Sequence, residues 1–342
     1  MNIMQNVSLA GYSTMGLGGV AAHLVEVTTR MEVLEALSWA GQQQLPAIMI
    51  GGGSNIIWGD SDYSGLVIVN KIRNYEIFEE DETNVYLTLG SGEPWDDTVA
   101  KTVEAGLTGI EALSLIPGTA GATPIQNVGA YGQEISQTLT TVEAFDAQVG
   151  DFVTLAGSDC GFAYRTSRFK TTDKGRFYIT GMTLHLTKDN PMPPFYGAVR
   201  AYFEEHGITE YSPAKLREAV LWIRSNKLPD PAVVRNTGSF FANPIVNDAQ
   251  LFELKNSYQD IPNWPQEDGR VKLSAAWLID QAGFKDYHDE ATGMATWSKQ
   301  SLVLINESAK STADLLRFKQ MIVDAVQSKF DITLVQEPEL IQ

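Results

Sequence analysis

The sequence predicts an α+β protein of more than one domain, on the basis of three observations. The chain has 342 residues, which at about 150 residues per domain gives roughly two or three domains. Its composition is that of an ordinary globular protein, with 44% hydrophobic and 20% charged residues, so wholesale disorder and fibrous repeats are excluded. Short apolar segments typical of strands alternate with longer segments of helical spacing. Strands and helices are therefore expected together in every region.

The first region, residues 1–73, is predicted to contain a strand, a helix and two further strands. Residues 23–29 alternate in hydrophobicity, as a half-buried strand does. Residues 31–44 have the spacing of an amphipathic helix. Two short apolar runs predict buried strands, at 46–50 and 65–71.

The second region, residues 74–228, combines strand-like segments with two helices. The helix predicted over 92–106 has a proline near its start and a glycine as its stop signal. Ser212-Pro213 opens the other helix, which ends at the Leu-Pro-Asp-Pro of 228–231. The strand-like segments are 85–90, 141–147, 151–156 and 177–187.

The third region, residues 229–330, is predicted to be a smaller unit of mixed structure. Its expected elements are a helix over 274–283, a strand over 301–306 and a helix over 311–330. The last of these helices begins at Ser311 with a Ser-Thr-Ala-Asp cap. Residues 332–342 are predicted to form a final strand, and we expect residues 331–342 to return and complete the second region.

Charge and cysteine content restrict the classes of partner. Asp and Glu number 42 against 25 Lys and Arg, which gives a formal net charge of −17. So acidic a chain repels a polyanion, and we expect no nucleic-acid partner. One cysteine, Cys160, cannot form an intramolecular disulfide or a multi-cysteine metal site. With no evident signal peptide and no apolar run of the ~20 residues that a membrane helix needs, we expect a cytoplasmic protein without membrane or metal.

The segment Gly51-Gly52-Gly53-Ser54-Asn55 directly follows an apolar strand. Three glycines let the backbone approach a ligand closely, and successive N–H groups can form an anion-binding nest. A flexible turn is the alternative. The segment is not a Walker A loop, because no Gly-Lys-Ser/Thr follows it, and the looser glycine pattern over 16–21 lacks the preceding strand of a dinucleotide fold.

Small residues dominate a second unusual segment, 116–132, which reads IPGTAGATPIQNVGAYG. No core can be built from so many small side chains. A backbone laid against a large flat ligand and its phosphates would explain the composition, and a structural loop is the alternative.

Several polar residues are candidates for chemistry, each with an ordinary alternative. Arg165 lies in the cation-rich FAYRTSRFK and suits a carboxylate or developing negative charge, unless this is a solvated strand edge. Arg224 and Lys227 end a helix, where they either hold an anion or complement the helix dipole. Ser239, in GSFFANP, is a donor or a turn serine, and Glu339 by itself resembles any carboxylate near a chain end.

Taken in order, these motifs resemble one family closely, the UDP-N-acetylenolpyruvoylglucosamine reductases in their longer, type I form. The matching runs are GGGSN, IPGTAGATPIQNVGAYG, FAYRTSRFK, RSNKLPDP, GSFFANP and EPEL, spread over residues 51–339. The resemblance implies that 1–73 and 74–228 form a two-part FAD-binding fold of the vanillyl-alcohol-oxidase type. Residues 229–330 would then form the substrate-binding α+β domain.

The resemblance also implies an activity and three catalytic residues. NADPH would reduce bound FAD, and UDP-N-acetylglucosamine enolpyruvate would then be reduced to UDP-N-acetylmuramate in peptidoglycan precursor synthesis, by a monomeric enzyme. Arg165 would stabilise developing charge, Glu339 would help polarise the substrate carboxylate, and Ser239 would donate the proton.

The remaining site residues follow from the same resemblance. Those expected to bind FAD are Gly51, Gly52, Gly53, Ser54, Asn55, Ile116, Pro117, Gly118, Gly121, Ala122, Thr123, Ile125, Gly129 and Arg224. Those expected to bind the substrate are Tyr131, Tyr196, Lys227, Asn243, Trp264 and Gln300.

Three positions depart from the family's usual pattern. Ala122 stands where a serine is common, so we expect one phosphate or ring contact to be lost. Trp264 stands where the type I form tends to carry a tyrosine, which keeps an aromatic lid without its hydroxyl. Ile341 stands where an arginine usually follows the glutamate, so a charge beside Glu339 is missing.

Two rival functions fit parts of the sequence. One is a flavin oxidase or dehydrogenase on the same fold with another substrate, against which GSFFANP and EPE argue, because such an enzyme has no need of that serine and glutamate. The other is a flavin- or nucleotide-binding module that regulates without catalysis. Joint retention of Arg165, Ser239 and Glu339 argues against it.

Overall fold

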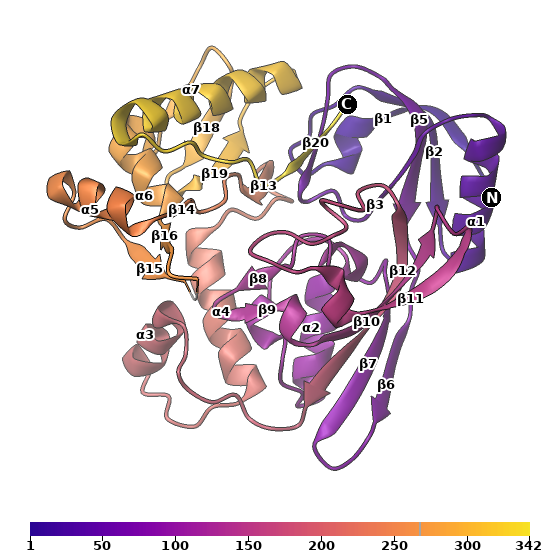
Figure 1. Cartoon of the computed structure of the whole chain (residues 1–342), viewed down its shortest axis with the longest axis horizontal. Helices are drawn as coiled ribbons and strands as arrows, with labels where there is room; N and C mark the ends of the chain where they lie inside the picture. Colours follow the sequence, from indigo (N-terminus) through magenta and orange to yellow (C-terminus); the bar gives the residue numbers. More distant parts are fainter. Residues whose placement is uncertain (267) are drawn as a thin grey trace. The chain divides into compact units, whose positions relative to one another are not determined.

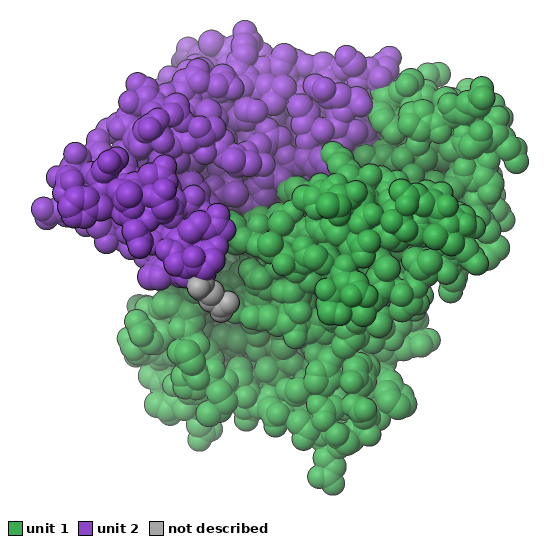
Figure 2. Space-filling view, viewed as in Figure 1, with its two compact units in different colours: residues 1–7, 21–52, 63–226 green, residues 8–20, 53–62, 227–342 purple. Residues whose placement is uncertain are grey.

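The computed structural model describes residues 1–266 and 268–342 and divides the chain into two compact units (Figure 2). Unit 1 consists of residues 1–7, 21–52 and 63–226, and unit 2 of residues 8–20, 53–62 and 227–342. Each unit is therefore assembled from three separate segments of the chain. The expected division into 1–73, 74–228 and 229–330 remains a proposal about domains.

The first sheet has the order β1-β2-β5-β3, and its β–α–β arrangement confirms the prediction for the first region. Its strands are β1 (Met4–Ser8), β2 (Val20–Val27), β5 (Tyr63–Asn70) and β3 (Ala47–Ile50). β5 pairs in parallel with both β2 and β3. Helix α1 (Arg30–Gln42) begins at a capping box of Thr29 and Glu32 and buries Val33, Ala36 and Ala40 in one core with β2 and β5.

The second sheet of unit 1 is antiparallel and has the order β11-β10-β12-β7-β6 (Figure 1). Its strands are β11 (Asp151–Ala156), β10 (Leu139–Asp146), β12 (Phe177–Thr187), β7 (Asn84–Gly90) and β6 (Tyr75–Glu79). Helix α2 (Trp95–Glu104) packs Trp95 and Val99 into the core of this sheet, and the Trp95 indole donates to the Leu113 carbonyl at 3.0 Å. The four predicted strands and the predicted helix are thereby confirmed.

Two helices complete unit 1. Helix α4 (Pro213–Lys227) is the predicted one, whereas α3 (Gly197–Glu205) was not predicted. Tyr202 and Phe203 of α3 share a buried apolar cluster with Leu216 and Val220 of α4. The tiny β8 (Gly129–Ala130) and β9 (Gln133–Glu134) form a separate hairpin.

The described residues of unit 2 form two small sheets of more than two strands, the pair of β4 and β20 treated below, and three α-helices. The sheets have the orders β13-β19-β18-β17 and β14-β16-β15. Their strands are β13 (Asn236–Ser239), β19 (Gln300–Asn306), β18 (Met294–Trp297), β17 (His288–Asp289), β14 (Ile245–Val246), β16 (Val271–Leu273) and β15 (Asn263–Pro265). The helices are α5 (Asp248–Ser257), α6 (Ala275–Ile279), which continues as a π-turn over Asp280–Phe284, and α7 (Thr312–Phe330).

The end of the chain corrects one expectation. Residues 331–342 were expected to complete the second region, but β20 (Glu339–Ile341) pairs in parallel with β4 (Ile56–Trp58) in unit 2. The strand is also shorter than predicted, because Pro338 has no N–H to donate to a ladder. Ile341 is buried in this pairing, which gives an apolar residue at that position a packing role.

No helix within residues 1–266 and 268–342 combines the length and the apolar character needed to cross a membrane.

Candidate active site

The glycines at 51 and 52 lie against the segment 118–119 within unit 1. A Cβ on Gly51 would stand 2.2 Å from Thr119 Oγ1, and a Cβ on Gly52 would stand 3.1 Å from Gly118 Cα. Their lack of side chains therefore lets two loops approach each other. Thr119, which was not among the predicted site residues, is the residue whose side chain leaves no room for a Cβ at Gly51.

The next residue of this segment belongs to unit 2. Gly53 has a φ of +70°, and a Cβ there would stand 2.3 Å from the Tyr12 carbonyl oxygen. Its own carbonyl accepts from the Thr14 N–H at 3.1 Å. Glycine is thus required at this position by both conformation and crowding.

The small-residue segment is held in a defined conformation, so it is not a loose linker. The N–H groups of Ala120 and Gly121 donate to the carbonyls of Glu93 and Ser91, both at 2.8 Å. A Cβ on Gly121 would stand 2.5 Å from Ser91 Cβ. Further along, the Ile125 carbonyl accepts from the buried Ser167 hydroxyl at 2.6 Å.

Arg165 projects from a tight turn rather than from a strand edge. Ala163 and Thr166 exchange both backbone hydrogen bonds, and Arg165 between them has a φ of +55°. Its Nη2 donates to the Gly129 carbonyl at 2.7 Å, which directs the guanidinium to the end of the small-residue segment. The ordinary alternative considered for this motif, a solvated strand, is therefore wrong.

Three predicted site residues, Tyr131, Tyr196 and Arg224, come together in unit 1. The rings of Tyr131 and Tyr196 meet edge to face with centroids 5.6 Å apart. Arg224 Nη2 donates to the Leu115 carbonyl at 3.1 Å, whereas Arg224 Nε is buried with no hydrogen-bond partner. Burial lowers the pKa of the Arg224 guanidinium, and the neighbouring Tyr131 opposes that shift. A buried N–H donor of a cation without an acceptor is what an anionic ligand would satisfy.

Ser239 lies on a β-bulge in unit 2. In the pairing of β13 with β19, Asn236 faces Ile305 and Ser239 faces Val303, so β13 carries one extra residue. Gly238, just before the serine, has a φ of +72°. Bulges of this kind redirect a side chain and are frequent beside active sites.

Glu339 lies in the same unit, on a segment hydrogen-bonded to the residues that follow Ser239. The Glu337 N–H donates to the Phe240 carbonyl at 2.9 Å, and the Glu339 N–H donates to the Asn55 carbonyl at 3.0 Å. Unit 2 thereby links the backbones that carry Asn55, Ser239 and Glu339. Arg165 belongs to unit 1.

The other expected substrate residues are more dispersed within unit 2. The Asn243 Oδ1 accepts from the Ala275 N–H at 3.0 Å and so caps α6, which is a structural task that the sequence did not indicate. The Lys227 carbonyl accepts from the Trp297 indole at 3.1 Å. Gln300 pairs with Trp297 across β19 and β18, whereas Trp264 lies in the other sheet, on β15.

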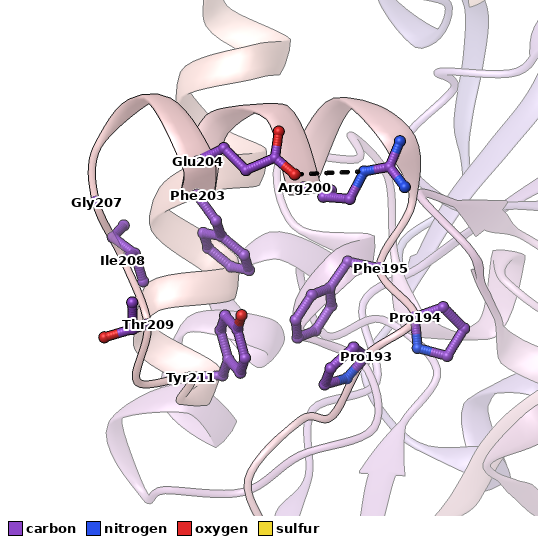
Figure 3. A pocket seen from close by; sticks show the side chains of 10 residues that line it. All are labelled: Pro193, Pro194, Phe195, Arg200, Phe203, Glu204, Gly207, Ile208, Thr209 and Tyr211. Atoms are coloured by element: carbon purple, nitrogen blue, oxygen red, sulfur yellow. Dashed lines mark ion pairs between the residues drawn. The ribbon is translucent and has the colours of Figure 1, made fainter.

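A cavity of about 500 Å³ lies in unit 1 and is lined by residues between 193 and 211, none of which is among the predicted site residues (Figure 3). Phe195 packs edge to face against Phe203 and Tyr211, with centroids 5.1 Å and 4.6 Å away. Phe195 immediately precedes Tyr196, whose side chain is 47% exposed. The aromatic cluster thus anchors the segment that presents Tyr196.

No group of three or more His, Cys, Asp or Glu side chains that would suit a metal ion occurs in the part of the chain that the structure describes.

Two stretches of the chain match known protein families. Residues 21–156 match a family described as an FAD binding domain, and residues 230–341 match the C-terminal domain of UDP-N-acetylenolpyruvoylglucosamine reductase. These matches confirm the expected FAD-binding fold with a second α+β domain.

Relatives and a solved structure agree with these matches. A UDP-N-acetylenolpyruvoylglucosamine reductase of Alcanivorax borkumensis is 42% identical over 341 residues, covering 99% of this chain and 96% of that protein. One of Pseudomonas fluorescens is 38% identical over 340 residues and covers 99% of each. The crystal structure of the Thermus caldophilus reductase covers 100% of both chains with a TM-score of 0.69 at 23% identity, which supports the fold. On the full-length identity to its relatives, the chain belongs to the UDP-N-acetylenolpyruvoylglucosamine reductase family.

Proposed function

We propose that this protein reduces UDP-N-acetylglucosamine enolpyruvate to UDP-N-acetylmuramate, with FAD as bound cofactor and NADPH as reductant. The reaction supplies peptidoglycan precursors in the cytoplasm, and the working form is a monomer. Support comes from the names of relatives that align over 99% of the chain and from the FAD-binding domain over 21–156.

The residues of unit 1 fit a dinucleotide cofactor. The close approach of Gly51 and Gly52 to residues 118–119 makes a backbone-lined surface, and the unpartnered Arg224 Nε supplies a donor for a phosphate. When bound, FAD supplies the hydride that NADPH provides. The expected FAD residues are proposed as its contacts, from Gly51 to Asn55 and from Ile116 to Gly129, together with Arg224.

The chain's own side chains then stabilise the negative charge that develops on the substrate and donate the proton. Hydride added to the terminal methylene of the enolpyruvyl group turns it into a methyl group and leaves negative charge on the carbon beside the carboxylate. Arg165 stabilises this charge, since its guanidinium is already held by the Gly129 carbonyl. Glu339 polarises the substrate carboxylate. The Ser239 hydroxyl donates the proton that completes the reaction.

Substrate binding is assigned to residues of both units. Lys227 suits the diphosphate as a compact charge, with Tyr196 and Asn243 at the diphosphate and sugar. The others proposed are Tyr131, Trp264 and Gln300. The observation that most supports the catalytic assignment is a pair of backbone hydrogen bonds within unit 2, from Glu337 to Phe240, the residue after Ser239, and from Glu339 to Asn55.

An anaerobic visible spectrum of the purified protein tests the proposal. NADPH is added first and the enolpyruvyl nucleotide sugar second. We expect the flavin band to bleach with NADPH and to return with the sugar nucleotide. A band that bleaches but does not return would retain a flavoenzyme and reject this substrate. A protein that takes up no FAD would reject the proposal altogether.

A further inference from the structure

Asn236, which none of the sequence motifs assigned to a task, contacts the bulge that carries Ser239. The residue is 2% exposed and begins β13. Its Oδ1 accepts from the Gly238 N–H at 2.8 Å. This hydrogen bond spans the extra residue of the bulge, so the side chain of Asn236 holds the backbone immediately before Ser239.

The amide nitrogen of the same side chain connects the bulge to a second segment. Asn236 Nδ2 donates to the Val234 carbonyl at 2.7 Å and to the Pro229 carbonyl at 3.4 Å. Pro229 lies two residues after Lys227, whose own carbonyl accepts from Trp297. One buried amide thus ties the Ser239 bulge to the stretch that begins with Lys227.

The conformation at Gly238 depends on this contact. A Cβ on Gly238 would meet nothing within 4 Å, so the left-handed φ of +72°, and not crowding, is what favours glycine at this position. The hydrogen bond from its N–H to Asn236 is the specific interaction that favours the turn. Without an acceptor at position 236, the bulge can relax and the Ser239 hydroxyl changes direction.

We infer that Asn236 is a positioning residue for proton transfer, which holds the Gly238 bulge so that the Ser239 hydroxyl points at the carbon it protonates. The inference rests on the proposed function, because it takes Ser239 as the proton donor. A misplacement of about 1 Å can cost roughly 100-fold in rate, so we expect a large kinetic effect from a residue that need not touch the substrate.

The test compares Asn236→Ala with Asn306→Ala in the full-length holoenzyme. Asn306 is also a buried asparagine of unit 2, on the paired strand β19, and its side chain bonds Met15 and Ala309 instead of the bulge. Stopped-flow absorbance measures flavin reduction by NADPH and reoxidation by the sugar nucleotide separately. For Asn236→Ala we expect reoxidation to slow by roughly 10- to 100-fold and reduction to stay within about twofold of the parent protein.

A second variant, Asn236→Asp, adds a signature that a merely structural role would not produce. Its carboxyl keeps the acceptor for Gly238 but carries the donor only when protonated. The carbonyl oxygens of Val234 and Pro229 can only accept a hydrogen bond. Lowering the pH protonates the introduced carboxyl, which can then donate to them as the Asn236 amide does. We expect the reoxidation rate of Asn236→Asp, relative to the parent at the same pH, to rise as the pH falls. This variant also decides the matter if Asn236→Ala does not fold.

Amide hydrogen exchange at Gly238 tests the geometry independently of turnover. Faster exchange in Asn236→Ala than in Asn306→Ala supports the inference, and unchanged protection overturns it. Equal slowing of both half-reactions, or equal slowing of reoxidation in Asn306→Ala, also overturns it. Failure of the parent protein to reoxidise with the sugar nucleotide would reject the proposed function instead, and the exchange result would still decide whether Asn236 holds the bulge.

Discussion

At the scale of single residues, the roles proposed for the catalytic groups are separable because the reaction has two halves. Proton delivery belongs only to the second half. The side chain of Ser239 is half-buried on its bulge, whereas Ser257 is exposed at the end of α5 in the same unit. The two serines form a matched pair for mutation.

For Ser239→Ala we expect flavin reduction by NADPH to be nearly unchanged and reoxidation by the sugar nucleotide to slow by roughly 10²- to 10⁴-fold, the usual range for loss of a general acid. Stopped-flow absorbance measures both steps, with Ser257→Ala as the control. Equal loss in both steps would assign Ser239 to binding or folding.

A second residue-scale expectation concerns acid stability. The nearly fully buried Asp146 accepts from Arg176 Nη2 at 2.6 Å and from Arg176 Nε at 2.9 Å. These hydrogen bonds lower the pKa of Asp146 from 3.8 to about 2. Because the folded-state value is depressed, the pair stabilises the protein above about pH 4, and this contribution is lost as the pH falls toward 2.

Arg176→Met should therefore lower the free energy of unfolding near pH 7 by about 2 kcal/mol, and its difference from the parent should narrow as the pH falls from 5 toward 3. Urea titration at several pH values measures this. Lys188→Met, which removes an exposed pair with Glu79 in the same unit, is the control. A difference that does not depend on pH would contradict the assignment.

At the scale of elements, helices α2 and α4 hold the start of the small-residue segment. The Asp96 carboxylate of α2 accepts from the Leu115 N–H and from Arg217 Nη1 of α4. Arg217 Nη1 also donates to the Ser114 hydroxyl at 2.8 Å. Burial by itself would raise the pKa of Asp96, but hydrogen bonds from Arg217 and Leu115 hold it below its ordinary value. The Asp96 carboxylate therefore stays charged and anchors the start of the small-residue segment.

Arg217→Met removes the cationic partner of Asp96 and should cost about 2 kcal/mol of stability. Because the loop loses an anchor, we also expect FAD to dissociate more readily, with Kd raised several-fold. Fluorescence titration of the apoprotein with FAD measures the second effect. Lys215→Met, which removes an exposed pair with Glu218 on the same helix, should change neither quantity appreciably. An unchanged Kd for Arg217→Met would mean that the hydrogen bonds of Arg217 do not contribute to flavin binding.

At the scale of the whole molecule, unit 2 cannot be obtained as one continuous fragment. Its core contains Met15, Leu17 and Ile57 together with residues of the C-terminal part such as Phe241 and Phe318. The same unit holds β4, the partner of β20. A fragment of residues 227–342 therefore lacks both buried apolar side chains and a strand partner.

We expect the 227–342 fragment to show no cooperative unfolding transition. Each missing large apolar side chain is comparable to a core truncation that costs roughly 2–5 kcal/mol, and ordinary domains are stable by only about 5–15 kcal/mol. Near-ultraviolet circular dichroism with urea titration checks this. In the full chain, Met15→Ala should destabilise strongly, and Met31→Ala, at an exposed position, should not. A cooperatively folded fragment would contradict this view of unit 2.

The sequence by itself determined the elements whose causes are local. Helix α1 and the strands β5 and β12 were predicted from the pattern of their own apolar residues, and α7 also from the cap at its first residues. The family was recognisable for the same reason, since its motifs are runs of consecutive residues. Helix α3 and the short strands of unit 2 were missed because brief elements carry little periodic signal.

Only the tertiary structure decided the arrangements that join distant residues. It paired Glu339 with Ile56, where the sequence predicted only that residues 331–342 return to the second region, and it placed Gly51 against Thr119. It also directed Arg165 to the Gly129 carbonyl and gave Asn236 a task that no motif indicated. Hydrophobic periodicity reports which face of an element is buried but not which residue covers it, so these contacts follow from the packing of the whole chain.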